Sequence, residues 1–505
     1  MPIPPAVEIA LDTINMRKQA LIFVNSKRSA EKVAEDIAKQ IKDTQPEWEL
    51  LAAQALKALS RPTKQCARLA LCLRKGVAYH HAGLVHKQRE LIEDAFRAGT
   101  IRIISATPTL AFGMDLPAFR CIVRDLRRFG QGGMVPLPVL EVQQMFGRAG
   151  RPGKEDYGEA ICIAGSEAEK QDIIDTYFNG LPEEIISKLA NEKTLRTYVL
   201  SLIATGFANS HASLMDIFSK TFYASQFKDL GRIGQRVAAA TEQLEEWGFV
   251  QSEESSNTSS SRAKDIGFIS AADLDKPDTA RIRPTPLGRR VAELYLDPLA
   301  ARHILDGFAR ATILSPFGVL HLLTSSSEFF QPRPRAKEME MLDALILGSD
   351  LLALEPPLYS PDYTAFMGAA KLAAMFLDWI DEQDEESILD KYSIRPGEIY
   401  SHRLQADWLL YCANELCRIT GQAKAATYSA MLRVRMKHGA REELLALLKF
   451  RDIGRVRARM LWNANIRSVG DVRRASLGQL AALLNPAVAR SLKEQVGEKG
   501  QQPIQ

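Results

Sequence analysis

An alternation of short apolar runs with helix-patterned segments through about the first 180 residues constrains the fold more than any other feature. The runs are rich in β-branched residues and read as strands buried on both faces. Between them, residues 29–42 and 86–96 space their apolar side chains by three and four, as amphipathic helices do. This alternation predicts an α/β domain with a mainly parallel sheet, whose functional residues follow the carboxyl ends of the strands. The predicted strands are residues 20–24, 77–79, 101–106, 121–124 and 160–164.

The 505 residues are too many for one hydrophobic core, since cores stop growing at about 250–300 residues. From about residue 191 the strands give way to helices. A hairpin-like pair at 247–251 and 265–270 flanks the polar run 253–261, and helices followed by such a hairpin are the layout of a winged helix. We therefore predict four domains: the α/β domain at 1–185, a winged helix at 186–297, a helical bundle at 298–439 and a small helical module at 440–505.

Charge and cysteine usage narrow the functional classes. The segment 433–474 holds twelve Lys and Arg against four acidic residues, a net charge of +8 in a chain whose total is +4. Such a concentration predicts a polyanion-binding patch.

Six cysteines without a CxxC pair argue against a disulfide scaffold and favour a reducing, cytoplasmic setting. No apolar stretch is long enough to span a membrane, and the histidines near residue 80 fit no zinc-ligand spacing, so no metal site is expected.

The most specific motif is Gln-Met-Phe-Gly-Arg-Ala-Gly-Arg-Pro-Gly at 144–153. Its arginines, Arg148 and Arg151, are three residues apart, which predicts that they share one helical face. Arginine suits a migrating phosphoryl group because its planar fork makes paired hydrogen bonds and stays protonated. The alternative is a surface arginine pair beside a turn.

Three further polar loops follow predicted strands. Residues 105–117 (SATPTLAFGMDLP) place hydroxyls and a Gly-x-Asp at a strand exit, and residues 23–29 and 79–84 repeat the pattern of strand and polar loop. Hydroxyls and an acid in such loops can hydrogen-bond nucleic-acid phosphate or a nucleotide ribose.

In this order, the four loops resemble the second motor domain of superfamily 2 helicases. The chain is similar to the HelQ-type DNA repair helicases common in archaea, and the similarity continues through residues 187–189 and 195–196 into the later domains. The resemblance implies a RecA-like motor domain, then a winged helix, a helical ratchet bundle and a C-terminal helix–hairpin–helix.

The resemblance also implies residue roles. Arg151 would be the arginine finger at the ATP γ-phosphate, with Arg148 and Gln144 beside it. Gly113 and Asp115 would lie at the nucleotide and couple it to DNA through Thr107 and Thr109; Asp115 stands where relatives often have Asn. The residues expected to touch DNA from the other two loops are Ser26, Lys27, Arg28, His81 and Gly83.

Two later segments are expected to bind DNA. In the family a long helix of the bundle stacks an aromatic side chain on a base, and Trp408 aligns with it; the alternative is a buried bundle residue. Arg403 lies near the family's arginine position, which is occupied here by Ser401. The run 452–471 resembles a helix–hairpin–helix, with Arg455, Arg457 and Arg459 suited to phosphate. The alternative is a solvated basic helix, and in the family this module can also restrain the motor.

The sequence contains no Gly-x-x-x-x-Gly-Lys-[Ser/Thr] loop, which a helicase motor needs for phosphate. Residues 381–384 (DEQD) imitate an acidic box, but they follow a helix pattern, and we predict a solvated helix end. We therefore expect a helicase without its first motor domain, carrying half of an ATP site, with the Mg²⁺ ligands on the missing domain. A separate chain that carries this domain would be a partner.

The function expected from this resemblance is that of the C-terminal part of an ATP-dependent helicase that moves 3′→5′ on single-stranded DNA. Single-stranded and forked DNA would be its partners, in repair, recombination or fork restart. Two alternatives stay open: a non-catalytic DNA-binding fragment or subunit of a split helicase, and an RNA helicase of the same superfamily.

Overall fold

The computed structural model describes residues 3–59, 61–111, 116–130, 133–150, 153, 155–253 and 281–497. The chain forms two compact units. Unit 1 comprises Met1–Ile185 together with Asp384–His402, and unit 2 comprises Ile186–Gln383 and Arg403–Gln505. The segment Asp384–His402, which the sequence analysis placed in the helical bundle, thus belongs by its contacts to the α/β unit.

Unit 1 is built on a five-stranded sheet in the order β2-β3-β1-β4-β7, in which every neighbouring pair is parallel. All five predicted strands are confirmed, with ends shifted by up to two residues. The strands β1 to β4 are buried along their whole length, as expected for a sheet covered on both faces. Their bounds are β1 Ala20–Phe23, β2 Val77–His80, β3 Ile103–Ala106, β4 Arg120–Val123 and β7 Glu159–Cys162.

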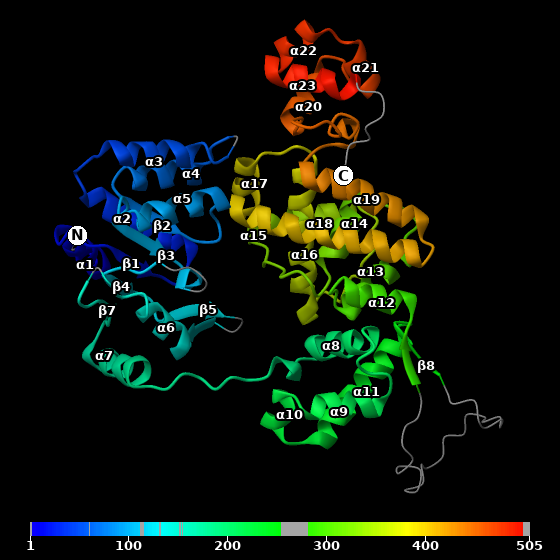
Figure 1. The fold of residues 1–505 in the computed structure, drawn as a ribbon, viewed down its shortest axis with the longest axis horizontal. Helices are drawn as coiled ribbons and strands as arrows, with labels where there is room; N and C mark the ends of the chain where they lie inside the picture. Colours follow the sequence, from blue (N-terminus) through cyan, green and yellow to red (C-terminus); the bar gives the residue numbers. More distant parts are fainter. Residues whose placement is uncertain are drawn as a thin grey trace. The chain divides into compact units, whose positions relative to one another are not determined.

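The helices of unit 1 lie on both sides of this sheet (Figure 1). The predicted helices 29–42 and 86–96 are confirmed as α2 Lys27–Gln40 and α5 His86–Arg97. Short strands β5 Arg127–Gly130 and β6 Gly133–Pro136 form a separate antiparallel hairpin. The other helices are α1 Pro5–Asn15, α3 Pro46–Leu56, α4 Lys64–Leu73, α6 Val139–Phe146, α7 Glu167–Ile173, α17 Glu385–Tyr392 and the first turns of α18 Pro396–Ile419.

Unit 2 begins with helices followed by an antiparallel strand pair. The strand that pairs with β8 Val250–Glu253 is β9 Arg281–Pro284, not the predicted 265–270, which lies outside the described residues. Because β9 begins nearly thirty residues after β8 ends, the strand's position could not be read from hairpin spacing. The helices here are α8 Glu192–Ala204, α9 His211–Ser219, α10 Phe222–Phe227, α11 Leu230–Glu246 and α12 Pro286–Glu293.

A helical bundle follows, centred on the long buried helix α16 Pro361–Ile380. Pro332 and Pro334 lie in the connection before α15, and Pro356 and Pro357 lie in the connection after it, because proline cannot continue a helix. The remaining helices of the bundle are α13 Pro298–Arg310, α14 Pro316–Thr324, α15 Ala336–Leu347, the rest of α18, and α19 Ala423–His438.

The last part of unit 2 has its own hydrophobic core, which includes Leu444, Leu461, Val472, Leu480 and Leu492. Its helices are α20 Arg455–Asn463, α21 Val469–Arg474, α22 Leu477–Leu483 and α23 Pro486–Gly497. None of the helices described here or above is long and apolar enough to cross a bilayer.

Candidate nucleotide and nucleic-acid site

The carboxyl ends of β1, β2, β3 and β4 meet at one edge of the sheet because the strands are parallel. Backbone contacts tie the exit loops together. The Asn25 N–H after β1 donates to Asp125 Oδ2 after β4 at 3.0 Å. The Thr107 N–H after β3 donates to the His80 carbonyl at the end of β2 at 3.3 Å. The loops after β1, β2, β3 and β4 therefore lie along one edge of the sheet, and the first three of them contain the predicted polar residues.

Three of the predicted nucleic-acid residues have exposed side chains on this edge: Ser26, Arg28 and Thr109. Ser26 begins α2, where its hydroxyl accepts the Ser29 N–H at 3.1 Å. The hydroxyls of Thr107 and Thr109 lie 3.0 Å apart. A helix N-terminus with neighbouring hydroxyls and a cation is suited to phosphate.

Of the other four predicted contacts of these loops, Thr107 is half-buried. Lys27 and Gly83 are covered by the segment Asp384–His402, and His81 is buried against α2. Lys27 forms an ion pair with Glu398. Gly83 is buried, and its carbonyl accepts the Gly397 N–H at 3.0 Å. The His81 ring is fully buried, 3.2 Å from Glu31, so its side chain offers no surface to a nucleic acid. Sequence reasoning could not foresee this cover, because more than 300 residues separate the partners.

The Gln-Arg motif departs from the prediction that its two arginines share a helical face. That prediction is wrong, because α6 ends at Phe146 and Gly147 is its C-cap. Arg148 lies in the following turn, where its Nη2 donates to the Ala111 carbonyl at 2.6 Å. Gln144 is exposed on the last turn of α6. The motif thus packs against the loop that carries Thr109.

A close glycine contact shapes the turn after Arg148. Gly150 has φ +90°, and a Cβ on Gly158 would lie 2.1 Å from the Gly150 nitrogen, so neither position favours a side chain. The Gly150 N–H also donates to the Ala118 carbonyl at 2.7 Å. Arg151, Gly113 and Asp115, the residues predicted closest to ATP, lie outside the described residues.

The β5–β6 hairpin is a feature that the sequence analysis missed. Phe129 on β5 is 81% exposed, next to the exposed Arg127. Arg128 anchors the hairpin to α6 through both carboxylate oxygens of Glu141, each at 2.8 Å. An exposed aromatic ring beside a cation suits base stacking. The signal was the Gly-Gln-Gly-Gly turn flanked by two short runs, which is typical of a hairpin.

Trp408 lies on α18 in unit 2 with its side chain half-buried. Its neighbours Ala406, Leu409 and Leu410 are buried and form the core-facing side of the helix. Arg403 is not turned freely to solvent: its Nη2 donates to the Lys437 carbonyl at 2.8 Å, and its guanidinium lies 3.9 Å from the centre of the Trp379 ring.

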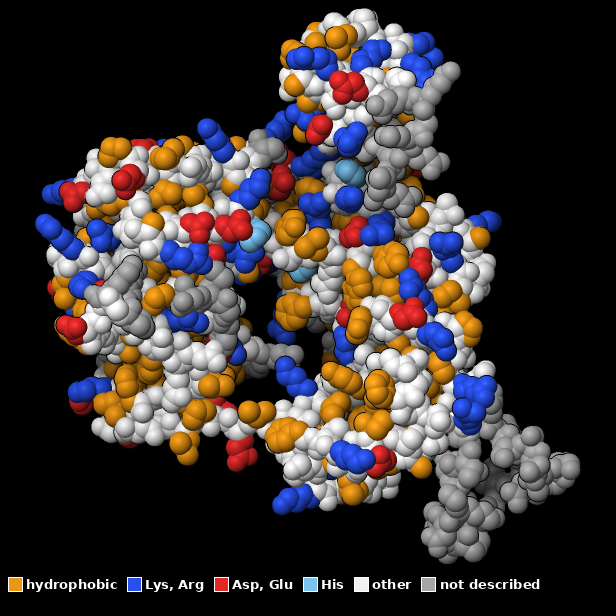
Figure 2. All heavy atoms as spheres, in the orientation of Figure 1, with side chains coloured by type: hydrophobic (Ala, Val, Ile, Leu, Met, Phe, Trp, Pro, Cys, Tyr) orange, Lys and Arg blue, Asp and Glu red, His pale blue; other side chains and the backbone are white. Residues whose placement is uncertain are grey.

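The three arginines of α20 are all engaged within unit 2. Arg455 donates to the Gln383 carbonyl at 3.1 Å, and Arg457 donates to the Asp452 carbonyl at 2.5 Å. Arg459 forms ion pairs with Glu382 at 2.6 Å and Glu443 at 2.9 Å. Lys and Arg side chains also gather on the surface of this module (Figure 2), so the basic patch extends beyond these three arginines.

The acidic run 381–384 is a helix end, as predicted, but it is not merely solvated. Asp381 pairs with Arg435 at 3.1 Å and Glu382 with Arg459. Burial alone would raise the pKa of Glu382, but the hydrogen bond and charge of Arg459 lower it. Asp384 accepts the Ser387 N–H at 2.9 Å and caps α17. These carboxylates serve packing and capping.

The histidines considered for zinc have carboxylate partners. His80 lies 2.8 Å from Glu93, and His86 lies 3.2 Å from Glu90. Across the described parts of the chain, no group of three or more His, Cys, Asp or Glu has the arrangement of a metal site.

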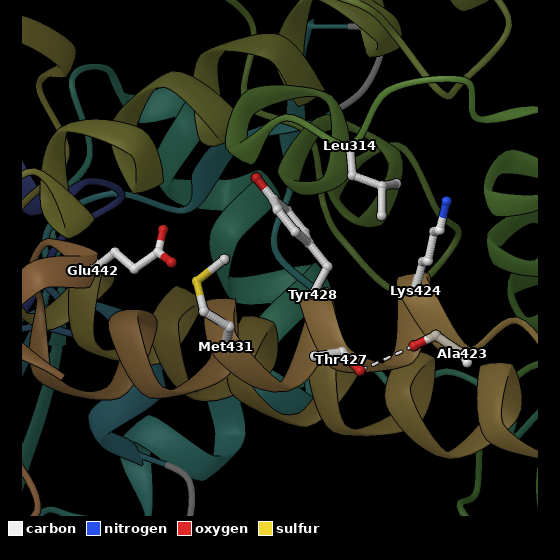
Figure 3. A pocket seen from close by; sticks show the side chains of 7 residues that line it. All are labelled: Leu314, Ala423, Lys424, Thr427, Tyr428, Met431 and Glu442. Atoms are coloured by element: carbon white, nitrogen blue, oxygen red, sulfur yellow. Dashed lines mark hydrogen bonds between the residues drawn. The ribbon is translucent and has the colours of Figure 1, made fainter. Parts of the chain in front are cut away.

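Unit 2 contains a cavity of about 550 Å³, and none of the predicted site residues lines it. Figure 3 shows the Thr427 hydroxyl turned to the Ala423 carbonyl, to which it donates at 3.0 Å. The lining residues are Leu314, Ala423, Lys424, Thr427, Tyr428, Met431 and Glu442.

Two family models match this chain, one over the parallel sheet and one over the helical bundle. Residues 6–153 match the helicase conserved C-terminal domain, and residues 317–439 match domain 4 of archaeal helicases. The fold and these matches define a helicase-class protein with a RecA-like domain.

Individual relatives make the family more specific. The ATP-dependent DNA helicase Hel308 of Methanococcus vannielii is 34% identical over 98% of this chain and 68% of its own length. The Hel308 proteins of Pyrococcus horikoshii and Pyrococcus abyssi are 36% and 35% identical over 94% of this chain and 63% of their own lengths. The chain belongs to the Hel308 family of ATP-dependent DNA helicases, and it spans 63% to 68% of the length of these three relatives.

Proposed function

We propose that this chain works as part of an ATP-dependent DNA helicase that moves 3′→5′ along a single strand in repair, recombination or fork restart. The observation that carries the proposal is the common sheet edge with Ser26, Arg28, Thr107 and Thr109, inside the region that matches the helicase C-terminal domain. The six cysteines are free thiols, which suits the cytoplasmic setting that we also propose.

For ATP, we propose that these residues supply the arginine half of the site. Arg151 would stabilise negative charge on the γ-phosphate, with Arg148 and Gln144 beside it and Gly113 and Asp115 at the nucleotide. The exposed Gln144 and the tight Gly150–Gly158 turn fit this role. The sequence has no phosphate-cradling loop, so hydrolysis would need a phosphate loop and Mg²⁺ ligands from outside these 505 residues, on a first motor domain.

For DNA, we propose a winged helix at 186–297, a ratchet bundle at 298–439 and a helix–hairpin–helix module at 440–505. Trp408 would stack on a base, a contact that tolerates any sequence. Arg403 on the same helix would approach the strand beside it. The arginines Arg455, Arg457 and Arg459 and the backbone at the N-terminus of α20 would bind phosphates of single-stranded or forked DNA.

A second candidate is a DNA-binding chain without its own catalysis, such as one subunit of a split helicase. The missing phosphate loop favours this behaviour for the 505 residues alone. Competition between DNA and RNA strands of equal length would test the remaining alternative, an RNA helicase.

The deciding experiment is DNA-stimulated ATP hydrolysis by the 505-residue chain, with Arg151→Ala as the control for contamination. We expect no hydrolysis but retained single-strand binding. Activity that Arg151→Ala abolishes would contradict the half-site, and loss of DNA binding would contradict the whole proposal.

A further inference from the structure

A hydrogen-bonded turn between α15 and α16 of unit 2 carries two large apolar side chains into solvent. The Ser360 N–H donates to the Pro357 carbonyl at 2.8 Å and closes the turn. Its two central residues are Leu358, which is 60% exposed, and Tyr359, which is 96% exposed. The Ser360 hydroxyl accepts the Asp362 N–H at 3.2 Å and caps α16. The backbone bonds on both sides therefore hold Leu358 and Tyr359 in a defined position.

The segment that leads into this turn is anchored as well. Arg310 Nη2 donates to the Leu352 carbonyl at 3.2 Å, and Leu352 itself is buried. A Cβ on Gly318, in the first turn of α14, would lie 2.4 Å from the Asp350 carbonyl oxygen, so this approach needs a glycine. A surface whose backbone is already ordered loses little conformational entropy when it binds a partner.

The surroundings of the turn are acidic. Residues 338–370 contain six Asp and Glu and no Lys or Arg. Glu355 and Asp362, on either side of the turn, both have exposed side chains, and charge of this sign repels nucleic-acid phosphate. The turn thus differs from the β5–β6 hairpin, where the exposed Phe129 lies beside Arg127. An apolar anchor with acidic neighbours suits a protein pocket that has a cation at its edge.

Unit 2 itself contains a pocket of this kind, the α19 cavity, lined mainly by one face of α19. Its volume of about 550 Å³ is within the ~300–1,000 Å³ range of pockets that enclose small ligands. Leu314, Tyr428 and Met431 supply apolar surface. Figure 3 shows Lys424 and Glu442 at opposite ends of the cavity. Because the Lys424 side chain is exposed, its ammonium is accessible to a carboxylate from another molecule.

The α19 cavity and the segment leading into the turn lie near the same end of α14. Leu314 is two residues before Pro316, where α14 begins, and the Asp350 carbonyl lies against Gly318 in its first turn. A turn and a cavity that are close together on one molecule form a self-complementary surface. Two copies related by a twofold axis can then exchange both contacts.

We propose that two copies of this chain associate by inserting the side chains of Leu358 and Tyr359 from each copy into the α19 cavity of the other. The acidic residues beside the turn approach Lys424, and Glu442 at the far end disfavours the reverse direction of entry. These side chains bury far less area than a permanent dimer needs, so the association is weak and depends on concentration. The contact uses none of the residues proposed to bind ATP or DNA.

Sedimentation velocity of the 505-residue chain without DNA, over the micromolar range, tests the association. We expect the mean sedimentation coefficient to rise with concentration, and to rise less at high salt because salt screens the charge of Lys424. A turn variant, Leu358→Ser with Tyr359→Ser, should weaken association at least about tenfold, as loss of a central apolar anchor does. A cavity variant, Thr427→Trp, fills the lining from an exposed position of α19 and should weaken it to the same degree.

Mixing the two variants tests whether the turn enters the cavity. The turn variant keeps the cavity and the cavity variant keeps the turn, so an equal mixture should form one-to-one pairs that neither forms alone. These pairs should be weaker than those of the unchanged chain, because one of the two contacts is lost. The matched controls are Tyr295→Ser, which removes another exposed tyrosine of unit 2, and Ala430→Trp, at an exposed position of α19 outside the lining. Both should associate as the unchanged chain does.

Circular dichroism should show the same helix content in all variants. If Thr427→Trp does not fold, Lys424→Glu takes its place, since it reverses the charge at the cavity. A chain that stays monomeric over this range would overturn the proposal, and so would association that survives in the turn variant or the cavity variant. Variants that fail to pair when mixed would show that the turn does not enter the cavity. Since no DNA is present, none of these outcomes bears on the proposed function.

Discussion

The guanidinium of Arg455 lies 4.4 Å from the centre of the Trp379 ring. Trp379 is at the end of α16, and its indole N–H donates to the Met436 carbonyl at 2.9 Å. Arg403 of α18 lies against the same ring. A cation over an indole contributes about 0.5–2 kcal/mol, so two arginines expected to bind DNA already contribute to packing. DNA would have to use their remaining N–H groups or compete with Trp379.

Replacing Trp408 with Ala should lower the affinity for single-stranded DNA. The lost stacking is worth about 1–3 kcal/mol, or roughly a fivefold to a hundredfold rise in Kd. Fluorescence anisotropy with a labelled strand measures the Kd, and circular dichroism should show unchanged helix content. Tyr359→Ala, which removes a side chain that is 96% exposed, is the control. Equal affinity of Trp408→Ala and the unchanged chain would remove the stacking role.

Replacing Glu382 with Gln should strengthen DNA binding at low salt. Glu382 holds Arg459 through two hydrogen bonds of 2.6 and 2.9 Å, and without its charge Arg459 is freer to bind phosphate. We expect about a threefold gain in affinity, which corresponds to the free energy of a partly exposed ion pair. Glu494→Gln makes the same change in net charge on an exposed residue of the same module and should have a smaller effect. A gain of the same size in both variants would argue against competition at Arg459.

Ending the chain after Gly439 should flatten the salt dependence of DNA binding. Each lost contact between a cation and a phosphate lowers the slope of log K against log salt by about 0.7 for a single strand. A chain ending at Gly497 keeps every described residue of the module and serves as the control. Identical slopes in the two shortened chains would mean that the module does not bind DNA.

Stability should fall on acidification because of His321. Its ring is fully buried, and burial lowers its pKa from 6.5 to about 4. The native state thus binds fewer protons than the unfolded state between these values, so the free energy of unfolding decreases as pH falls from 6.5 to 4. The loss attributable to this ring is about 3 kcal/mol.

His321→Gln keeps a donor for the Phe366 carbonyl and should remove that part of the pH dependence in urea unfolding. His86→Gln, at a side chain that is 67% exposed, is the control and should leave the profile unchanged. A His321→Gln profile as steep as that of the unchanged chain would contradict the assignment.

Local patterns were sufficient for much of the fold. Apolar runs of three to six residues predicted all five strands of the sheet, because strands covered on both faces need such runs. The prediction from local pattern failed at the end of α6. The helix pattern of the Gln-Arg motif did not show that α6 stops at Phe146, since the Gly147 cap and the Ala118 bridge to Ala149 decide its end.

The candidate site was predictable only in part. The sequence by itself determined that polar loops follow the strands and that positive charge gathers in 433–474. Only the tertiary structure decided which of those residues face solvent. Ser26 and Thr109 are exposed, whereas Gly83 is covered by a helix start more than 300 residues away and His81 is buried against Glu31 of α2. Strand and helix patterns arise from neighbours along the chain, but burial of a loop depends on packing between distant segments, which no local pattern records.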